Sequence, residues 1–334
     1  MSSYETIGVD EATRFEGYGA ELAELQRRRA AKGGAVERAL HLKAHTGVVG
    51  ELVVSSSGAP EAARVGVFAT PGQRFPVYVR FSNGSSMRQP DKTPDVRGFA
   101  LKLVGVPGKK LIVGLEDEQT QDFLLINDPA IPFRDPHEFM AFVRAARGGP
   151  ALMLPKLFAG LGFGRSLSIL KRALSSPKVP SFATHTFHTA APIALGAAAA
   201  KLALFPLQSG ATSASSSDHF LRDDLLQRLK NGALSWSLKA QLFVNEQSTP
   251  IEDASVVWSV PWVELATFTI PKQDPESPKG KEIAALVESL SFDPWHSLAE
   301  HRPLGAIMRA RAVAYKSSVL GRNAAPEPKT VIAL

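Results

Sequence analysis

Cysteine is absent from the 334-residue sequence. Its absence excludes disulfide bonds, structural zinc sites built from thiolates and haem groups ligated by a thiolate, and it agrees with a reducing cytoplasm. The first residues, Met1 to Glu5, contain no basic segment followed by an apolar run. We therefore expect no secretory signal and a cytoplasmic location.

Long uninterrupted apolar runs and clusters of one charge are also missing. The most apolar stretch, residues 190–207, contains Pro192, Lys201 and Pro206. It predicts a buried or surface-docked helix rather than a membrane span, and it leaves peripheral contact with lipid open. The net charge is +6, but Lys and Arg are spread along the chain, so nucleic acid is not an expected partner.

The apolar patterning predicts an α+β fold in a single domain, residues 1–334. A helix is expected over residues 11–31, ended by Gly33-Gly34. Alternation and turn signals predict about eight antiparallel strands, which would close a barrel with surrounding helices. The expected strands are 48–54, 75–82, 99–104, 111–115, 123–126, 234–244, 256–260 and 265–270, and the other expected helices are 135–147, 152–159, 197–204, 218–229, 281–290 and 306–322.

Two residues near the C-terminus are spaced for contact on one helix face. Arg311 precedes Tyr315 by four positions, so its guanidinium could hydrogen-bond the phenol oxygen and favour the phenolate, a hard ligand for ferric iron. Arg322 returns to about the same face seven residues later and could meet a carboxylate there. The alternative is a solvated arginine face beside a half-buried core tyrosine.

Four collinear motifs resemble the haem-binding core of the catalases. The residues are Arg38-x-x-His41-x-Lys43, then Arg80-Phe81-Ser82, then Arg97-Gly98-Phe99-Ala100-x-Lys102, then Arg311-x-x-x-Tyr315 followed by Arg322. The resemblance covers residues 35–145, the distal half and barrel start, and residues 285–325, the proximal helix region. It is thin across 150–217, an Ala/Leu/Pro-rich insert expected to be helical.

The resemblance implies a catalase-type antiparallel β-barrel that binds haem b, with Tyr315 as the iron ligand and Arg311 supporting it. It implies that the haem propionates are bound by three arginines: Arg38, Arg80 and Arg322. His41 takes the position of the distal acid–base group. His45 remains an alternative, because one extra residue lies between His41 and Gly50 relative to the family spacing.

Two further distal positions follow from the same resemblance. Ser82 corresponds to the hydroxyl that orients the distal histidine, although it could instead be a strand-edge serine. Asn127 is the candidate for the distal asparagine, but alignment places it at the second of the family's two asparagines, so a structural turn role stays open. Ile131-Pro132-Phe133 replaces the family's paired channel phenylalanines.

The implied function is that of a haem peroxidase with weak catalase activity. The chain resembles the compact catalase-related haemoproteins, in which a shortened channel admits hydrogen peroxide or bulkier organic hydroperoxides together with a small organic reductant. A homo-oligomer is usual in such families. The alternatives are a fatty-acid hydroperoxide isomerase or dehydratase of the allene oxide synthase type, and a non-catalytic haem- or lipid-binding barrel.

Overall fold

A computed structural model of the chain describes residues 4–31, 36–147, 150–174, 178–210 and 217–334. These residues contain one antiparallel sheet of nine strands. The strands are β1 (Ala44–Val54), β2 (Arg74–Asn83), β3 (Arg97–Val104), β4 (Thr120–Ile126), β5 (Phe187–His188), β6 (Ile193–Leu195), β7 (Ala198–Pro206), β8 (Leu234–Leu242) and β9 (Trp262–Ile270).

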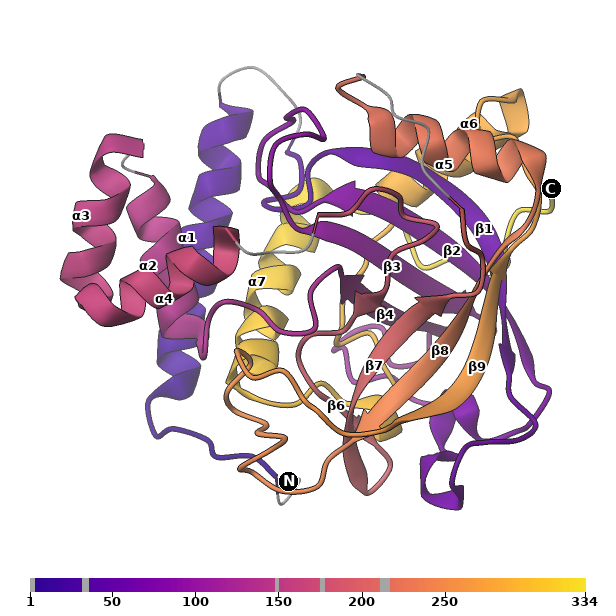
Figure 1. Ribbon diagram of the computed structural model, residues 1–334, viewed down its shortest axis with the longest axis horizontal. Helices are drawn as coiled ribbons and strands as arrows, with labels where there is room; N and C mark the ends of the chain where they lie inside the picture. The colour runs from indigo at the N-terminus through magenta and orange to yellow at the C-terminus, as the bar shows by residue number, and fades with distance from the viewer. Residues whose placement is uncertain (1–3, 32–35, 148–149, 175–177, 211–216) are drawn as a thin grey trace.

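The sheet closes on itself. Strands β1 to β4 form a meander, and β1 also pairs with β9, which continues through β8 to β7. The short strand β5 pairs with both β4 and β7, so eight strands complete a barrel, and β6 is a ninth strand added to β7 as a hairpin (Figure 1). This confirms the predicted α+β fold with an antiparallel barrel of about eight strands.

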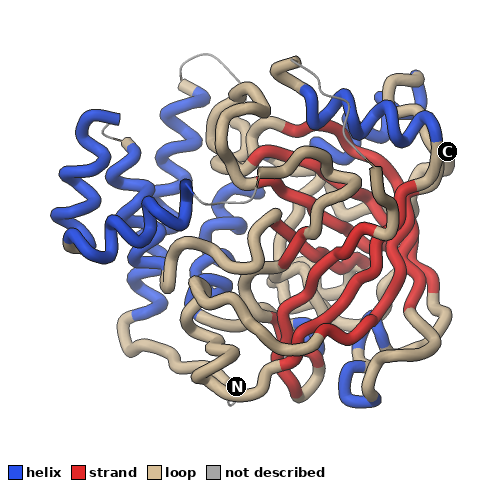
Figure 2. The backbone as a smooth tube through the Cα atoms, viewed as in Figure 1, coloured by secondary structure: helices blue, strands red, loops and turns tan. Residues whose placement is uncertain are grey.

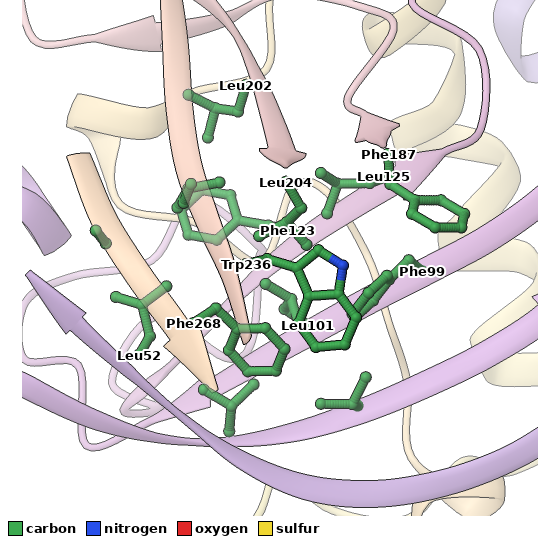
Figure 3. Packing of buried hydrophobic residues seen from close by; sticks show 14 of the residues in the cluster. Leu52, Phe99, Leu101, Phe123, Leu125, Phe187, Leu202, Leu204, Trp236 and Phe268 are labelled. Atoms are coloured by element: carbon green, nitrogen blue, oxygen red, sulfur yellow. The ribbon is translucent and has the colours of Figure 1, made fainter. Parts of the chain in front are cut away.

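The barrel interior is apolar because each strand alternates its side chains between two faces. In β2 the inward residues Phe75, Val77, Val79 and Phe81 belong to the main core, as predicted. At its centre the rings of Phe99, Trp236 and Phe268 meet with centroids 5.2–6.0 Å apart (Figure 3). The outward face of β2 carries Tyr78, Arg80 and Ser82.

The helices lie outside the barrel. They are α1 (Glu11–Ala30), α2 (Pro136–Ala146), α3 (Pro150–Leu161), α4 (Phe163–Leu174), α5 (Phe220–Asn231), α6 (Pro278–Ser289) and α7 (Ala306–Arg322). Helix α2 begins as predicted, since the side chain of Asp135 accepts a hydrogen bond from the Glu138 amide at 3.0 Å and proline fills the first position. The glycines expected to end α1, Gly33 and Gly34, lie outside the described residues.

Helices α1 and α7 run side by side against the barrel, and α2 to α4 form a lobe beyond them (Figure 1). Gly19 permits the close approach of α1 to α7, because a Cβ atom there would lie 2.7 Å from Cγ1 of Val313. Helix α6 covers the outer face of β1 and β2. Among the described residues, no helix is both long enough and apolar enough to cross a membrane.

The helix predicted over residues 197–204 is wrong, and so is a helical reading of the whole 190–207 stretch. Residues 193–206 form the β6–β7 hairpin, and six consecutive residues of β7 are buried. A strand that is buried on both faces shows no alternation of apolar and polar residues, so its sequence lacks the usual strand pattern. The alanine-rich composition therefore predicted a helix, whereas pairing with β8 makes this segment a strand. The insert 150–217 is therefore helical only in its first part.

Two shorter predicted strands are also wrong. Residues 111–115 and 256–260 form turns and loops (Figure 2). Beside the first of them, Lys110 makes a single bridge to Leu298. Neither segment has a partner strand, and most of their residues are at least partly exposed: Val113 is 84% exposed, and only Trp258 is buried. Local apolar composition thus wrongly predicted strand pairing in both segments.

Candidate functional site

His41 lies outside the barrel, against the ends of β2 and β3. Its backbone takes a left-handed conformation, φ 55°, and its amide donates to the Gly84 carbonyl at 2.9 Å. Nδ1 lies 3.0 Å from Oγ of Ser82, and Arg80 donates from Nη2 to the His41 carbonyl at 2.9 Å. The predicted shared face of Arg80 and Ser82 is confirmed, and both residues hold His41.

Gly98 gives the imidazole its space. A Cβ atom at Gly98 would lie 2.6 Å from Nδ1 of His41 and 2.8 Å from Oγ of Ser82. Gly98 belongs to the Arg-Gly-Phe motif on β3, directly opposite Ser82 in the sheet register. The sequence therefore contained the signal, but the reason for a glycine at this position becomes visible only in the packing.

The imidazole of His41 is held in its neutral form. Burial, together with the charges of Arg80, Arg311 and Arg38, lowers its pKa to about 3. A neutral ring has one nitrogen without a proton, which can act as a base. Because Nδ1 faces the Ser82 hydroxyl, Nε2 is the nitrogen left to accept a proton.

His45 occupies a different environment. The register between β1 and β2 shifts between Ala44 and Thr46, so His45 is the extra residue of a β-bulge. Its Nε2 lies 2.7 Å from Oδ1 of Asn83, and its ring meets Phe182 at 5.0 Å. The bulge absorbs the extra residue before Gly50 and leaves Ala44 opposite Ser82.

Three arginines gather around one carboxylate. Arg80 donates from Nε to Oε2 of Glu288 at 2.9 Å, and Arg38 contacts Oε1 of Glu288 and donates from Nη2 to the Leu290 carbonyl at 2.8 Å. Arg322 reaches the same carbonyl at 3.5 Å, and its buried Nε has no hydrogen-bond partner. The structure thus brings together the three arginines that were expected to bind propionates.

This cluster is strongly electropositive. Burial lowers the pKa of Arg38 to about 9, and Arg80 and Arg322 add to the effect while Glu288 and Tyr315 oppose it. Since a guanidinium does not lose its proton in proteins, the low pKa expresses the cost of keeping three buried cations together. Glu288 was not anticipated from the sequence, because a glutamate near the end of a surface helix carries no distinguishing pattern.

Tyr315 and Arg311 lie on helix α7, as their spacing predicts. Arg311 donates from Nη2 to the phenol oxygen of Tyr315 at 2.9 Å, and its guanidinium carbon lies 5.1 Å from the ring centroid. Helix α7 spans Ala306–Arg322, the range predicted. The charge of Arg311 acts on His41 and that of Tyr315 acts on Arg38, so this part of α7 lies close to both residues.

Asn127 is engaged elsewhere. Its side-chain Oδ1 accepts a hydrogen bond from the backbone amide of Arg97 at 2.7 Å, and the backbone amide of Asn127 donates to the Arg97 carbonyl at 3.1 Å. Asn127 therefore holds the first residue of β3, Arg97, through two hydrogen bonds, which agrees with the alternative that Asn127 has a structural role in a turn. Beyond it, Phe133 packs against Phe139 and Phe142 of α2, with ring centroids 5.5 and 5.3 Å away.

The donor set fits a haem group. Three arginines offer partners for two carboxylates, and the unpartnered Nε of Arg322 can take one more acceptor. Tyr315, with its hydrogen bond from Arg311, would supply an oxygen ligand for the iron, and His41 would supply a neutral imidazole. Sequence reasoning found these residues because they fall in short motifs, and it missed Glu288 and the reason for Gly98.

Comparison with known proteins gives a consistent answer. The family model described as Catalase matches residues 21–159. Catalase-A of Dictyostelium discoideum is 30% identical over 115 residues, which cover 34% of this chain and 21% of that protein. The region that the family model matches includes His41, Ser82 and Asn127 and ends before α7.

Solved catalases share the fold. A fungal catalase superposes with a TM-score of 0.66 at 20% identity over 89% of this chain and 61% of its own length. Catalase A from Saccharomyces cerevisiae gives 0.66 at 17% identity over 88% and 63%, and a bacterial catalase gives 0.62 at 20% identity over 91% and 60%. The chain thus spans about a fifth of the curated relative and about three-fifths of these structures.

Proposed function

Membership in the catalase superfamily is supported by the family match over residues 21–159 and by the shared fold, and from it we propose a haem-dependent peroxidase that reduces hydrogen peroxide or organic hydroperoxides. The oxidoreductase class follows from the family. The narrower activity, haem b as the cofactor and a small organic reductant are our proposal. One observation carries the proposal: the His41–Ser82 pair and the Arg311–Tyr315 pair both lie close to the cluster of three arginines.

The residues of the chain divide the work as follows. Arg38, Arg80 and Arg322 bind the haem propionates, and Tyr315 ligates the iron. When bound, haem would supply the two electrons that cleave the O–O bond, and the small organic reductant would later replace them. His41 would take the hydroperoxide proton at Nε2 and return it to the outer oxygen, which would leave as water or an alcohol.

Ser82 and Gly98 act through His41. The Ser82 hydroxyl orients the ring by its contact with Nδ1, and Gly98 leaves room for the ring beside β3. The low pKa of His41 keeps the ring unprotonated across neutral pH and makes its conjugate acid release the proton readily.

The proposed preference for peroxidase over catalase chemistry rests on the distal wall. The Asn127 carboxamide is occupied by Arg97, and Ile126 stands where the aligned family has its first asparagine. A polar amide that would position the small, hydrophilic hydrogen peroxide is thus replaced by an apolar side chain. Such a wall favours hydroperoxides that carry an apolar substituent.

The test is reconstitution of the full chain with haem. We expect a tyrosinate-type ferric spectrum, consumption of cumene hydroperoxide at a rate comparable to that of hydrogen peroxide, and oxidation of a one-electron donor. Tyr315→Phe should lose that spectrum and most haem retention, while Tyr4→Phe, far along the chain, should keep both. An unchanged spectrum in Tyr315→Phe would refute the ligand assignment, and isomerised hydroperoxide without donor oxidation would indicate the isomerase class.

A further inference from the structure

Acidic residues are missing from a long central stretch. Between Glu138 and Asp218 the chain contains no aspartate or glutamate. The same stretch contains eight basic residues: Arg144, Arg147, Lys156, Arg165, Lys171, Arg172, Lys178 and Lys201. The four arginines form ion pairs with acids from outside the stretch: Arg144 and Arg147 with Glu21, Arg165 with Glu138 and Arg172 with Asp128. The exposed lysines Lys156 and Lys171 have no acidic residue near them in the sequence and no ion pair among the described residues.

Part of this stretch protrudes from the molecule. Helices α3 and α4 form a hairpin around Gly162, whose φ of 75° permits the tight turn, and this hairpin lies at the far end of the lobe beyond α1 (Figure 1). Its inner side is closed by Leu157 and Ile169, which are fully buried, and by Ser166, which donates from Oγ to the Leu157 carbonyl at 3.0 Å.

The outer side of the hairpin combines apolar and basic side chains at helical spacing. On α4, Phe163, Leu167 and Lys171 follow one another at intervals of four and form one exposed ridge, with Phe163 67% and Leu167 52% exposed. On α3, Leu152, 52% exposed, precedes exposed Lys156 by the same interval. No other exposed phenylalanine occurs among the described residues.

Two basic residues of α4 do not belong to this outer side. Arg165 donates from Nε to Oε1 of Glu138 at 2.7 Å, and Arg172 donates from Nη2 to Oδ1 of Asp128 at 2.6 Å. These ion pairs fix α4 to the body of the protein and orient Phe163, Leu167 and Lys171 outward. The hairpin is therefore held in a defined orientation.

We propose that the α3–α4 hairpin docks on a membrane surface that contains anionic lipids. Apolar side chains flanked by lysines, with no acidic residue on either helix, are the composition of helices that lie in the lipid headgroup region. Phe163, Leu167 and Leu152 insert between the headgroups, and Lys156 and Lys171 contact lipid phosphates while their stems stay apolar. A symmetric contact between the hairpins of two copies would place lysines opposite lysines, because the hairpin contains no acidic residue that could pair with them.

The position of the hairpin gives docking a consequence, which rests on the proposed peroxidase function. Arg172 binds Asp128, and Arg165 donates to the Pro132 carbonyl at 3.2 Å, so α4 is tied to residues 128–133 of the distal wall. Docking would bring this wall next to the lipid surface. The substrate class favoured by this arrangement is hydroperoxides of membrane lipids.

The test is binding of the purified full chain to vesicles, with and without haem. Vesicles of equal parts phosphatidylglycerol and phosphatidylcholine should sediment with the protein, and vesicles of phosphatidylcholine alone should bind at least about tenfold less protein. Raising the salt concentration should weaken the binding. Equal binding to both vesicle types, or binding to neither, would overturn the proposal.

Paired variants locate the surface. Phe163→Ser with Leu167→Ser, and separately Lys156→Glu with Lys171→Glu, should each lower the vesicle partition coefficient by at least about tenfold. The matched controls change exposed residues elsewhere: Leu207→Ser with Val244→Ser, and Lys272→Glu with Lys281→Glu. If the control variants lose as much vesicle binding as the hairpin variants, the hairpin is not the docking surface.

Two further results would test the docking proposal and separate it from the proposed peroxidase function. If the protein is an oligomer that dissociates in the Phe163→Ser, Leu167→Ser variant, a second copy covers the ridge and the proposal fails. Vesicle binding needs no haem, so its failure leaves the peroxidase function intact. Conversely, vesicle binding by a chain that reduces no detergent-dispersed hydroperoxide would sustain docking and refute the proposed function.

Discussion

Glu288 is the residue on which the electropositive pocket depends. Its carboxylate accepts hydrogen bonds from Arg80 and Arg38, the arginines proposed to bind propionates. Burial alone would raise the pKa of Glu288, but Arg80 and Arg38 outweigh it and lower the pKa. Glu288 therefore stabilises the pocket while it competes with propionates for the same donors.

Glu288→Gln should separate these two effects. Removing the charge leaves the arginines less well paired, so the free energy of unfolding of the haem-free protein should fall by about 1 kcal/mol, since the glutamate side chain is half exposed. Haem release to an acceptor protein should become slower by about fivefold, because the propionates lose a competitor. Glu282→Gln, on the same helix but paired with Lys279, is the control and should change neither quantity. Faster haem release in Glu288→Gln would show that Glu288 positions the arginines instead.

The two histidines four residues apart should differ sharply in their effect on rate. His41→Ala removes the proposed base and should slow the reaction of the haem-loaded protein with hydroperoxide by about 10²–10⁴-fold, measured by rapid mixing, with the ferric spectrum nearly intact. His45→Ala should leave this rate within a few-fold and instead lower stability by about 1–3 kcal/mol, because it breaks the buried contact with Asn83. The reverse pattern would assign the acid–base role to His45.

At the scale of the elements, the backbone of strand β3 packs against the imidazole of His41 at Gly98. Gly98 pairs with Ser82 on one side and with Ile126 on the other, so the backbone cannot move to admit a side chain. In Gly98→Ala the imidazole must shift instead, and we expect the hydroperoxide reaction to slow by at least about tenfold, since small misplacements of a catalytic group are costly. Gly17→Ala, at an open position on α1, is the matched control and should leave the rate unchanged.

The elements also show what the sequence could predict. Helix α7, the Asp135 cap and the alternation in β2 follow from spacing alone, because each is decided by neighbours within one or two turns. The β6–β7 hairpin was misread as a helix because its pairing partner, β8, begins about thirty residues later. The bulge at His45 appeared in the sequence only as one extra residue, whose location depends on the register with β2.

At the scale of the whole molecule, several histidines are buried without charge. Burial lowers the pKa of His41 to about 3 and the pKa values of His45, His188 and His301 to about 4, below the value near 6.5 expected in the unfolded chain. Between these values the unfolded chain binds protons that the folded protein does not. Stability contributed by these residues is therefore present above about pH 6.5 and is lost as the pH falls toward 4.

Three buried carboxyls act in the opposite direction. Burial raises the pKa of Asp293 to about 7 and also raises the pKa values of Asp95 and Asp122, so their contributions are present at low pH and are lost as the pH rises through the raised values. The histidines, with His185 as a fifth whose pKa is lowered by burial, outnumber these carboxyls, so the free energy of unfolding should fall as the pH falls through 5. We expect the haem-free protein to unfold before the pH reaches about 4, measured by urea unfolding across a pH series.

His188→Phe tests this account with the packing preserved. The ring of His188 lies 6.0 Å from that of Trp262 and 6.4 Å from that of Phe205, contacts that phenylalanine can keep. Because the variant removes one titrating group, the slope between pH 6 and pH 4 should become shallower by about 1.4 kcal/mol per pH unit, with little change near neutral pH. A wild-type stability that stayed flat down to pH 4 would mean that the folded protein accommodates charged imidazoles. His41 would then take up a proton near pH 6.5, and the rate of the hydroperoxide reaction should decline below that pH.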